Sequence, residues 1–201
     1  MRAGCESNPV GTSDSELIQI VDSAMAEAAR RSGSWLACRP GCCECCIGPF
    51  PITPLDAIRL QEGLRDLDAR DPGRAESVRR RALAAAERMR REYPDDPVGK
   101  VLAIEEAAAD EPCPALDPVT RTCDLYAARP ITCRTFGPAV RFGAESVAVC
   151  ELCYRGATDV QIASCEVAVD PEDLEGELLR DLAARGVAGE TIVAFALVAA
   201  S

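Results

Sequence analysis

The stretch CRPGCCECC, residues 38–46, places five cysteines within nine residues. Pro40, Gly41 and the glycine and prolines of residues 48–51 interrupt any regular helix or strand, so we expect a loop here. The chain contains no histidine. A metal site in this loop must therefore use thiolates alone, or thiolates with carboxylates.

The composition favours a mainly α protein. At 201 residues the chain is long enough for one ordinary domain with a hydrophobic core. Aromatic residues make up only 4%, so a core of Ala, Leu, Val and Ile is expected, which suits closely packed helices. We predict one domain over residues 1–201: helical, with an irregular cysteine-rich metal-binding lobe and minor short β-strands.

Helices are predicted on both sides of the cysteine loop. Ser13-Asp-Ser-Glu16 fits a capping box and predicts a helix over about 14–31. After the loop, Thr53-Pro54 is typical of an N-cap followed by proline at the first helical position. The cysteine loop is therefore expected to lie between two helices.

The rest of the chain changes character twice. Residues 111–138 are rich in proline and cysteine and are predicted to be irregular. Two β-prone runs follow at Val140 to Phe142 and at Val147 to Val149. Asp170-Pro171 predicts the start of C-terminal helices over about 171–200.

The charge argues against nucleic acid as a partner. The net charge of −11 would repel a phosphate backbone. The counter-signal is a group of seven arginines between residues 74 and 91, for which we weigh pairing with acidic side chains of the same protein against a patch for an acidic partner.

No membrane association is expected either. The chain has no apolar run of eighteen or more residues, so we predict no membrane span. Cys5 follows small residues, as in lipoprotein cleavage sites, but no hydrophobic targeting region precedes it. We therefore predict a cytoplasmic protein.

Disulfides and metal ligation both have to be considered for the twelve cysteines. A cytosolic chain would keep thiols reduced, and neighbours such as Cys42 and Cys43 are awkward for ordinary bridges because their Cα atoms are only about 3.8 Å apart. Cysteines two residues apart can instead turn back onto one ion. That spacing occurs at Cys42/Cys45, Cys43/Cys46 and Cys150/Cys153. Metal binding therefore explains the pattern better, with zinc and iron-sulfur clusters both compatible.

The longer pattern resembles a known family. Cys38-x3-Cys42-x2-Cys45-Cys46, then Cys113-Pro-Ala-Leu-Asp117, then Cys123-Asp-Leu-Tyr-Ala-Ala-Arg-Pro-Ile-Thr-Cys-Arg-Thr-Phe136 is similar to the YkgJ-like cysteine-cluster family. That family is described as chelating zinc or iron and includes flagellin lysine N-methylases. The resemblance covers about residues 38–155.

The resemblance implies a set of metal ligands. They are Cys38, Cys42, Cys45, Cys46, Cys113, Cys123 and Cys133, with Cys150 as an eighth. Eight thiols suffice for two four-cysteine sites or for one larger cluster. The extra Cys43 leaves open whether Cys42 or Cys43 is the ligand. The implied cofactor is an iron-sulfur cluster, with 4Fe-4S preferred, or zinc.

Residues near the late cysteines have roles to weigh. Arg129 and Arg134 either donate hydrogen bonds to the sulfurs, offsetting the charge of several thiolates, or pair with acidic side chains. Tyr126 and Phe136 are expected to pack over the site and shield it from water. Neither role requires catalysis.

Whether the chain is an enzyme stays open. The spacing Cys38-x3-Cys42-x2-Cys45 also fits radical S-adenosylmethionine enzymes, but no alternating strands and helices follow it. The methylase relatives imply a second option, an iron-sulfur-assisted, S-adenosylmethionine-dependent protein lysine N-methyltransferase. We predict a metal-binding cysteine-cluster protein of unknown pathway, with this methyltransferase as the alternative and no known protein partner.

Overall fold

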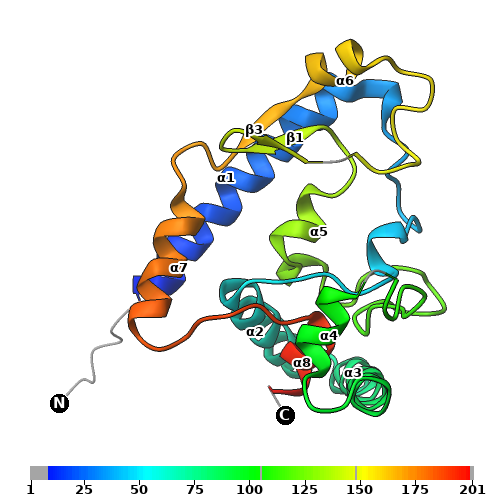
Figure 1. Cartoon of the computed structure of the whole chain (residues 1–201), viewed down its shortest axis with the longest axis vertical. Coiled ribbons are helices and arrows are strands. Elements are labelled where there is room, and N and C mark those ends of the chain that lie inside the picture. Colours follow the sequence, from blue (N-terminus) through cyan, green and yellow to red (C-terminus); the bar gives the residue numbers. More distant parts are fainter. Residues whose placement is uncertain (1–8, 105, 148, 200–201) are drawn as a thin grey trace. The chain divides into compact units, whose positions relative to one another are not determined.

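The computed structural model describes residues 9–104, 106–147 and 149–199, and these residues are mainly helical (Figure 1), which confirms the predicted class. The α-helices of the described residues are α1 (Pro9–Ser32), α2 (Pro54–Arg70), α3 (Pro72–Glu92), α4 (Pro97–Ala103), α5 (Ile131–Thr135), α6 (Asp159–Cys165), α7 (Leu174–Ala184) and α8 (Val193–Val198). The strands are β1 (Val140–Phe142), β2 (Glu145–Ser146) and β3 (Val167–Val169). Short 3₁₀ helices lie at Gly33–Trp35, Glu44–Cys46 and Tyr126–Ala128.

The chain divides into two compact units, each made of two separate stretches. Unit 1 comprises the chain up to Cys38 together with Arg134–Val187, and unit 2 comprises Arg39–Cys133 together with the chain from Ala188 on. The prediction of a single domain over 1–201 stays a prediction. The two units are described separately below.

Unit 1 is built on the long helix α1. Helices α6 and α7 and strand β3 pack against α1 (Figure 1). The sheet has the order β2-β1-β3, with β1 antiparallel to β2 and parallel to β3. In the parallel pair, Val140 lies opposite Val167. The predicted strand at Val140 to Phe142 is confirmed as β1, whereas β3 was not predicted.

Several predicted boundaries of unit 1 were wrong. Helix α1 begins at Pro9, so the expected capping box at Ser13 lies within the helix rather than at its start. Helix α7 begins at Leu174 instead of Pro171, because Asp170 has a positive φ of 50° and its carboxylate accepts the N–H of Leu174 from outside the helix. The second strand is Glu145–Ser146, and not Val147 to Val149, of which residue 148 lies outside the described residues.

Unit 2 has its core between α2, α3 and α8. The buried side chains of this core include Leu60, Leu64, Val78, Ala82 and Leu197. Apolar residues three and four positions apart on α2 and α3 supply these contacts, as expected for amphipathic helices.

The two stretches of unit 2 are also joined through the backbone. The N–H of Ile52 donates to the Thr191 carbonyl over 2.9 Å, and the N–H of Thr191 donates back to Ile52 over 3.1 Å. Next to this bridge, Thr53 caps α2 in a capping box with Asp56, which confirms the predicted helix start. The cysteine loop thus ends on a firmly held helix.

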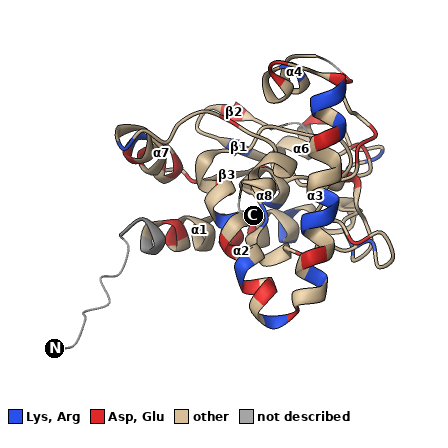
Figure 2. Cartoon of the chain, turned by 90° about the horizontal axis from the view of Figure 1, so that it is seen from below, with Lys and Arg blue, Asp and Glu red and all other residues tan. Residues whose placement is uncertain are grey.

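The arginines of α3 pair with acidic residues of unit 2. Blue and red residues alternate along α3 in Figure 2. Four of the seven arginines between residues 74 and 91 form ion pairs with residues outside α3, namely Arg74, Arg79, Arg81 and Arg88. Arg90 lies over the ring of Phe195, 5.0 Å from its centroid. These contacts favour pairing within the protein over a patch for an acidic partner.

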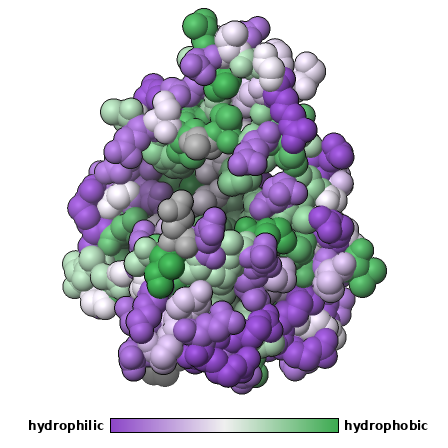
Figure 3. Space-filling view, turned by 45° about the vertical axis from the view of Figure 1, so that its right-hand side comes forward, coloured by the Kyte–Doolittle hydropathy of each residue, from purple (hydrophilic) through white to green (hydrophobic). Residues whose placement is uncertain are grey.

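The surface carries scattered apolar side chains. Val119, Tyr126 and Val160 are among the large apolar or aromatic residues that stay exposed. In the face drawn in Figure 3, hydrophobic residues are interspersed with hydrophilic ones. In the part of the chain that the structure describes, no helix is both long enough and apolar enough to span a bilayer.

Candidate metal centre

The cysteine loop of unit 2 folds as two consecutive tight turns. The N–H of Cys42 donates to the Arg39 carbonyl over 2.9 Å, and the N–H of Cys46 donates to the Cys43 carbonyl over 2.8 Å. The second turn is the 3₁₀ helix Glu44–Cys46. The prediction of an irregular loop is therefore right, and this short helix fixes the backbone at Cys45 and Cys46.

A second cysteine segment pairs with this loop. The N–H of Cys113 donates to the Cys46 carbonyl over 2.7 Å, and the N–H of Gly48 donates to the Glu111 carbonyl over 2.9 Å. Between these two bonds, Ile47 and Pro112 form an antiparallel bridge. Two cysteines that are far apart in the sequence are thus joined by their own backbones.

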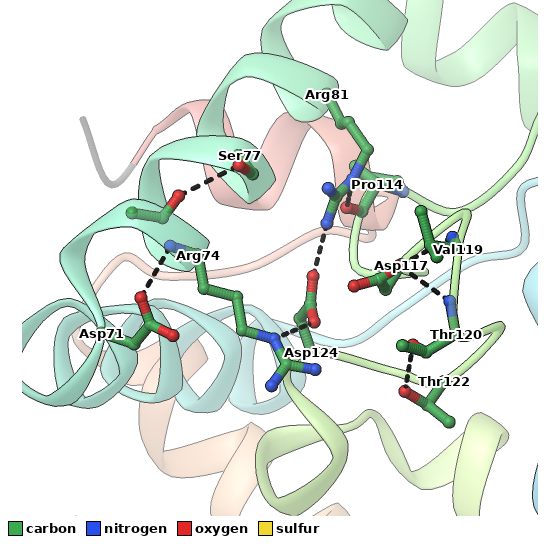
Figure 4. A network of polar contacts seen from close by, with 11 residues as sticks. Asp71, Arg74, Ser77, Arg81, Pro114, Asp117, Val119, Thr120, Thr122 and Asp124 are labelled. Atoms are coloured by element: carbon green, nitrogen blue, oxygen red, sulfur yellow. Dashed lines mark hydrogen bonds and ion pairs between the residues drawn. The ribbon is translucent and has the colours of Figure 1, made fainter.

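A third cysteine reaches the same place through a loop over residues 113–124. Leu116 and Cys123 form an antiparallel bridge, and the N–H of Asp124 donates to the Ala115 carbonyl over 2.7 Å. At the tip of the loop, Asp117 accepts the N–H groups of Val119 and Thr120 over 2.7 and 3.0 Å (Figure 4). The two backbone bonds to Asp117 lower the pKa of its carboxyl, and the turn stays closed as long as that carboxyl is ionised.

The fourth position, Cys133, is set by a buried ion pair. Asp56 is 1% exposed, accepts the Nη1–H of Arg59 over 2.6 Å and also accepts the N–H of Ile131 over 3.0 Å. This bond anchors the start of α5, and Cys133 lies in its first turn. In the preceding 3₁₀ helix, the Ala128 side chain comes so close to α2 that only glycine fits at Gly63, where an added Cβ would lie 2.3 Å from the Ala128 Cβ.

The neighbouring sulfurs of Cys45 and Cys46 are in hydrogen-bond contact. Their Sγ atoms are 4.0 Å apart. The hydrogen bond from Cys46 lowers the pKa of Cys45 to about 7, with help from the positive charge of Arg129, while the same bond raises the pKa of Cys46. Near neutral pH Cys45 is therefore partly ionised, whereas Cys46 stays a thiol.

The other three thiols are kept protonated by their surroundings. Burial is the largest cause in each case and raises the pKa of Cys113 to about 12; it also raises the pKa of Cys123 and Cys133. Cys45 adds a like-charge contribution at all three. Five thiols, which we call the unit 2 thiol cluster, are thus close enough to influence one another's ionisation: Cys45, Cys46, Cys113, Cys123 and Cys133.

Two arginines of α3 hold the segments that carry Cys113 and Cys123. The carboxylate of Asp124, 1% exposed, lies between Arg74 Nε at 2.5 Å and Arg81 Nη2 at 2.6 Å (Figure 4). The same Arg81 donates its Nε–H to the Pro114 carbonyl over 2.8 Å. Arg81 therefore connects the residue after Cys113 with the residue after Cys123. Sequence reasoning missed this connection.

Cys43 has a different environment from its neighbours. Its side chain is 2% exposed, and its Sγ accepts a hydrogen bond from Arg121 Nη2 over 2.6 Å. For Cys42, the described contact is the turn bond to Arg39, so its role as a ligand stays a prediction. Arg121 binds the sulfur of Cys43 and thereby joins the cysteine loop to the tip of the 113–124 loop.

The remaining predicted ligands, Cys38 and Cys150, belong to unit 1. They lie there with Cys153 and Cys165, which the resemblance left outside its ligand set, although the spacing of Cys150 and Cys153 suits a shared ion. Cys5 lies outside the described residues. None of the eleven described cysteines forms a disulfide.

The residues around the late cysteines differ partly from expectation. Arg134 pairs with Asp22 over 2.8 Å, so it takes the acidic-partner role, whereas Arg129 acts on the thiols by lowering the pKa of Cys45. Tyr126 and Phe136 do not shield the site as expected, because they are 61% and 41% exposed. The ring of Tyr126 instead faces the guanidinium of Arg129, 4.0 Å away.

The donor set fits a thiophilic metal. Buried thiols that raise one another's pKa need positive charge nearby in order to ionise. A bound cation supplies that charge. Among the described residues, no group of three or more Cys, Asp or Glu side chains has the arrangement of a closed metal site. Binding an ion therefore requires the thiol side chains to turn from the positions that the structure shows.

Comparison with known families identifies the cysteine pattern. Residues 37–154 match the model of the CxxCxxCC family, described as a "Putative zinc- or iron-chelating domain". The chain belongs to the CxxCxxCC family. The match includes every cysteine of the unit 2 thiol cluster and extends through Cys38, Cys150 and Cys153. Comparisons of this CxxCxxCC protein with curated proteins and with solved structures find no significant match.

Proposed function

We propose that this CxxCxxCC protein binds zinc or iron through the unit 2 thiol cluster, with ligands drawn from Cys45, Cys46, Cys113, Cys123 and Cys133. The observation that carries the proposal is the backbone bond from Cys113 to Cys46, which brings two distant cysteine segments together. The Leu116–Cys123 bridge adds the third segment. All-thiolate donors suit zinc and iron better than harder cations.

The spacing of the neighbouring sulfurs favours a single ion. A tetrahedral zinc site with Zn–S bonds of about 2.3 Å holds its sulfurs about 3.8 Å apart. The sulfurs of Cys45 and Cys46 are 4.0 Å apart, close to this value. A 4Fe-4S cluster puts each cysteine on a different iron atom and so spreads the sulfurs more widely. We therefore place a single zinc or iron ion ahead of the 4Fe-4S cluster that the sequence favoured.

The chain's own residues prepare the site for a cation. Cys45 is partly ionised near neutral pH, while Cys46, Cys113, Cys123 and Cys133 must each lose a proton before they ligate. Arg129 contributes positive charge, which offsets the excess negative charge of several thiolates. A bound zinc ion would serve as a structural link between the segments, whereas iron would also add redox chemistry.

The metal is tested by anaerobic purification followed by metal and acid-labile sulfide analysis and an absorption spectrum. A single-ion site gives one zinc or iron and no sulfide for the unit 2 thiol cluster. Equal amounts of acid-labile sulfide and iron, together with a broad absorption near 400 nm, would instead establish an iron-sulfur cluster. Zinc alone in a colourless protein would exclude iron.

The ligands are tested by paired replacements. Cys113→Ser together with Cys123→Ser should remove the metal of unit 2. Cys165→Ser is the matched control, since Cys165 is also buried but lies in unit 1, where its thiol donates to the Arg31 carbonyl over 3.4 Å. Equal metal loss from the pair and from the control would refute the assignment.

We place the protein in the cytoplasm, because a site that depends on free thiols needs a reducing compartment. The lysine N-methyltransferase alternative has no observation in its favour among the described residues or in the family match, and it stays a prediction from sequence. Binding of S-adenosylmethionine to the metal-loaded protein, measured by calorimetry, would revive it.

A further inference from the structure

Two segments of unit 1 bring cysteines toward one glycine. The N–H of Cys150 donates to the Gly137 carbonyl over 3.3 Å, and the N–H of Cys153 donates to the Cys150 carbonyl over 2.8 Å in a tight turn. Cys38 approaches the same glycine from the end of the 3₁₀ segment that follows α1. Cysteines from residues 38 and 150–153 therefore share one neighbourhood.

Gly137 leaves the space that these sulfurs occupy. A Cβ added at Gly137 would lie 2.8 Å from the Cys38 Sγ and 4.0 Å from the Cys153 Sγ. The φ of Gly137 is +121°, a conformation that other residues rarely adopt. The position of Gly137 thus allows two sulfurs from distant parts of the chain to face one point.

Tyr154 fixes the segments around this point. Its N–H donates to the Trp35 carbonyl over 2.9 Å, and its hydroxyl forms a 2.5 Å hydrogen bond with Ser32 Oγ. The same hydroxyl accepts the N–H of Ala139 over 3.0 Å. One buried side chain therefore connects the end of α1, the strand after Gly137 and the Cys150–Cys153 turn, so the arrangement of the cysteines is preorganised.

Two of the three thiols are buried and the third is exposed to solvent. Cys150 and Cys153 are 7% and 4% exposed, whereas Cys38 lies at the surface. Cys165 is buried nearby, but its thiol donates to the Arg31 carbonyl over 3.4 Å and so is directed toward α1. Two buried ligands with a third at the surface leave a route for an ion and an open coordination position on the solvent side.

We propose that Cys38, Cys150 and Cys153 of unit 1 form a second metal site that takes a soft divalent cation of the zinc class with three thiolates and one exchangeable ligand. The proposal goes beyond the function proposed above, because it adds a second ion and assigns Cys153, which the family resemblance left outside its ligand set. As in unit 2, the side chains have to turn to close on the ion. The three-ligand arrangement is that of zinc sites that keep a position open.

The test is a zinc and cobalt(II) titration of the metal-free full-length protein under anaerobic conditions. The wild type should bind two equivalents, and Cys150→Ser with Cys153→Ser should bind one. The same double replacement should remove about half of the thiolate-to-cobalt absorption. Cys165→Ser is the matched control in the same unit and should keep both equivalents. Circular dichroism checks that each variant is folded.

A second variant keeps the test decisive if the double replacement unfolds unit 1. Gly137→Ala leaves every thiol in place but puts a methyl group against the Cys38 sulfur. It should weaken one of the two equivalents by at least tenfold and leave the other unchanged. If the Gly137→Ala variant and the double variant both still bind two equivalents of metal with wild-type affinity, the second site is refuted.

The two proposals fail separately in this experiment. Loss of one equivalent in the Cys150/Cys153 variant, with none lost in the Cys113/Cys123 variant, would refute the unit 2 site and keep the unit 1 site. The reverse result would refute the unit 1 site alone. A Cys150–Cys153 disulfide in anaerobically isolated protein, with one equivalent of zinc bound, would also overturn the second site.

Discussion

The two units treat their thiols differently. In unit 2 the cysteine segments are joined by backbone bonds and surrounded by charged groups, with Arg81 connecting two segments and Arg129 acting on Cys45. In unit 1 the thiols of Cys150 and Cys153 lie in an apolar cluster with Tyr154. Among the described contacts, no arginines connect these thiols as Arg81 connects the segments of unit 2. Positive charge around thiolates favours their ionisation, whereas an apolar setting opposes it.

This difference predicts an order of affinity. The unit 2 thiol cluster should bind its ion more tightly, because Cys45 is already partly ionised near neutral pH. Burial raises the pKa of Cys150 in unit 1, as it does for Cys113, Cys123 and Cys133 in unit 2, so the lowered pKa of Cys45 makes the difference. The first equivalent in a titration should therefore load unit 2.

The largest expected effect comes from removing the metal of unit 2. Structural zinc contributes on the order of 10 kcal/mol to folding in small zinc-dependent domains, and less where a core exists, as it does here. We expect the double variant Cys113→Ser, Cys123→Ser to lower the free energy of unfolding of unit 2 by several kcal/mol, because unit 2 then loses the contribution of its bound metal. Urea unfolding followed by hydrogen exchange separates the two units. Equal loss of protection in both units would contradict the comparison.

The pH dependence of stability should reverse when the metal is removed. In the metal-free protein, burial raises the pKa of Cys113 to about 12 from an ordinary value of 9.0. A raised pKa stabilises the folded state below the ordinary value, and this stabilisation is lost as the pH rises from about 9 to about 12. With metal bound the thiols are deprotonated, so stability should fall as the pH is lowered. Thermal unfolding between pH 5 and 11, with and without a chelator, measures both slopes, and slopes of the same sign would argue against thiolate ligation.

Asp124 should matter more than an exposed acid in a similar pair. Asp124→Asn leaves Arg74 and Arg81 without their buried carboxylate and should cost unit 2 about 2 kcal/mol, since both arginines are partly exposed. It should also weaken metal binding about tenfold, as outer partners of metal ligands do.

The control for Asp124 is Asp68→Asn. Asp68 pairs with Arg79 over 3.0 Å on the surface of unit 2, where solvent screens the pair, so its loss should cost clearly less stability than the loss of Asp124. Chemical denaturation and a zinc competition assay give the two readouts. Similar metal affinities in both variants would show that the arginine pairing only stabilises the fold.

The smallest effect should be confined to unit 1. Tyr154→Phe removes the hydroxyl that binds Ser32 and Ala139, which should cost about 1–2 kcal/mol because buried polar groups lose their partner. The second metal equivalent should weaken while the first stays unchanged. A zinc titration of this variant checks the assignment, and a weakened first equivalent would contradict it.

Local chemistry made several elements predictable. Thr53 and Pro54 predicted the start of α2, and the apolar spacing and low aromatic content predicted the helical class. These signals depend on residues that are neighbours along the chain. The expectation that cysteines from two regions converge also agrees with the joined segments of Cys46, Cys113 and Cys123.

Long-range pairing could not be read in the same way. Cys38 is the first residue of the 38–46 loop, yet it belongs to unit 1 with Cys150, where its sulfur lies beside Gly137 and Tyr154 binds the nearby Trp35 carbonyl. Strand β3 has only three residues and depends on β1 for its pairing, so no periodicity marks it. The excess of arginine in α3 was visible, but its partner Asp124 depends on how the 113–124 loop folds.

The interleaving of the two units bears on how the protein is made. Helix α8 supplies Leu197 to the core of unit 2, and Thr191 pairs with Ile52, yet a ribosome makes α8 only after all of unit 1. Unit 2 therefore cannot complete its core while unit 1 is still being synthesised. During that interval unit 2 lacks the apolar contacts that α8 makes with α2 and α3, so it reaches its full stability only once α8 has been made.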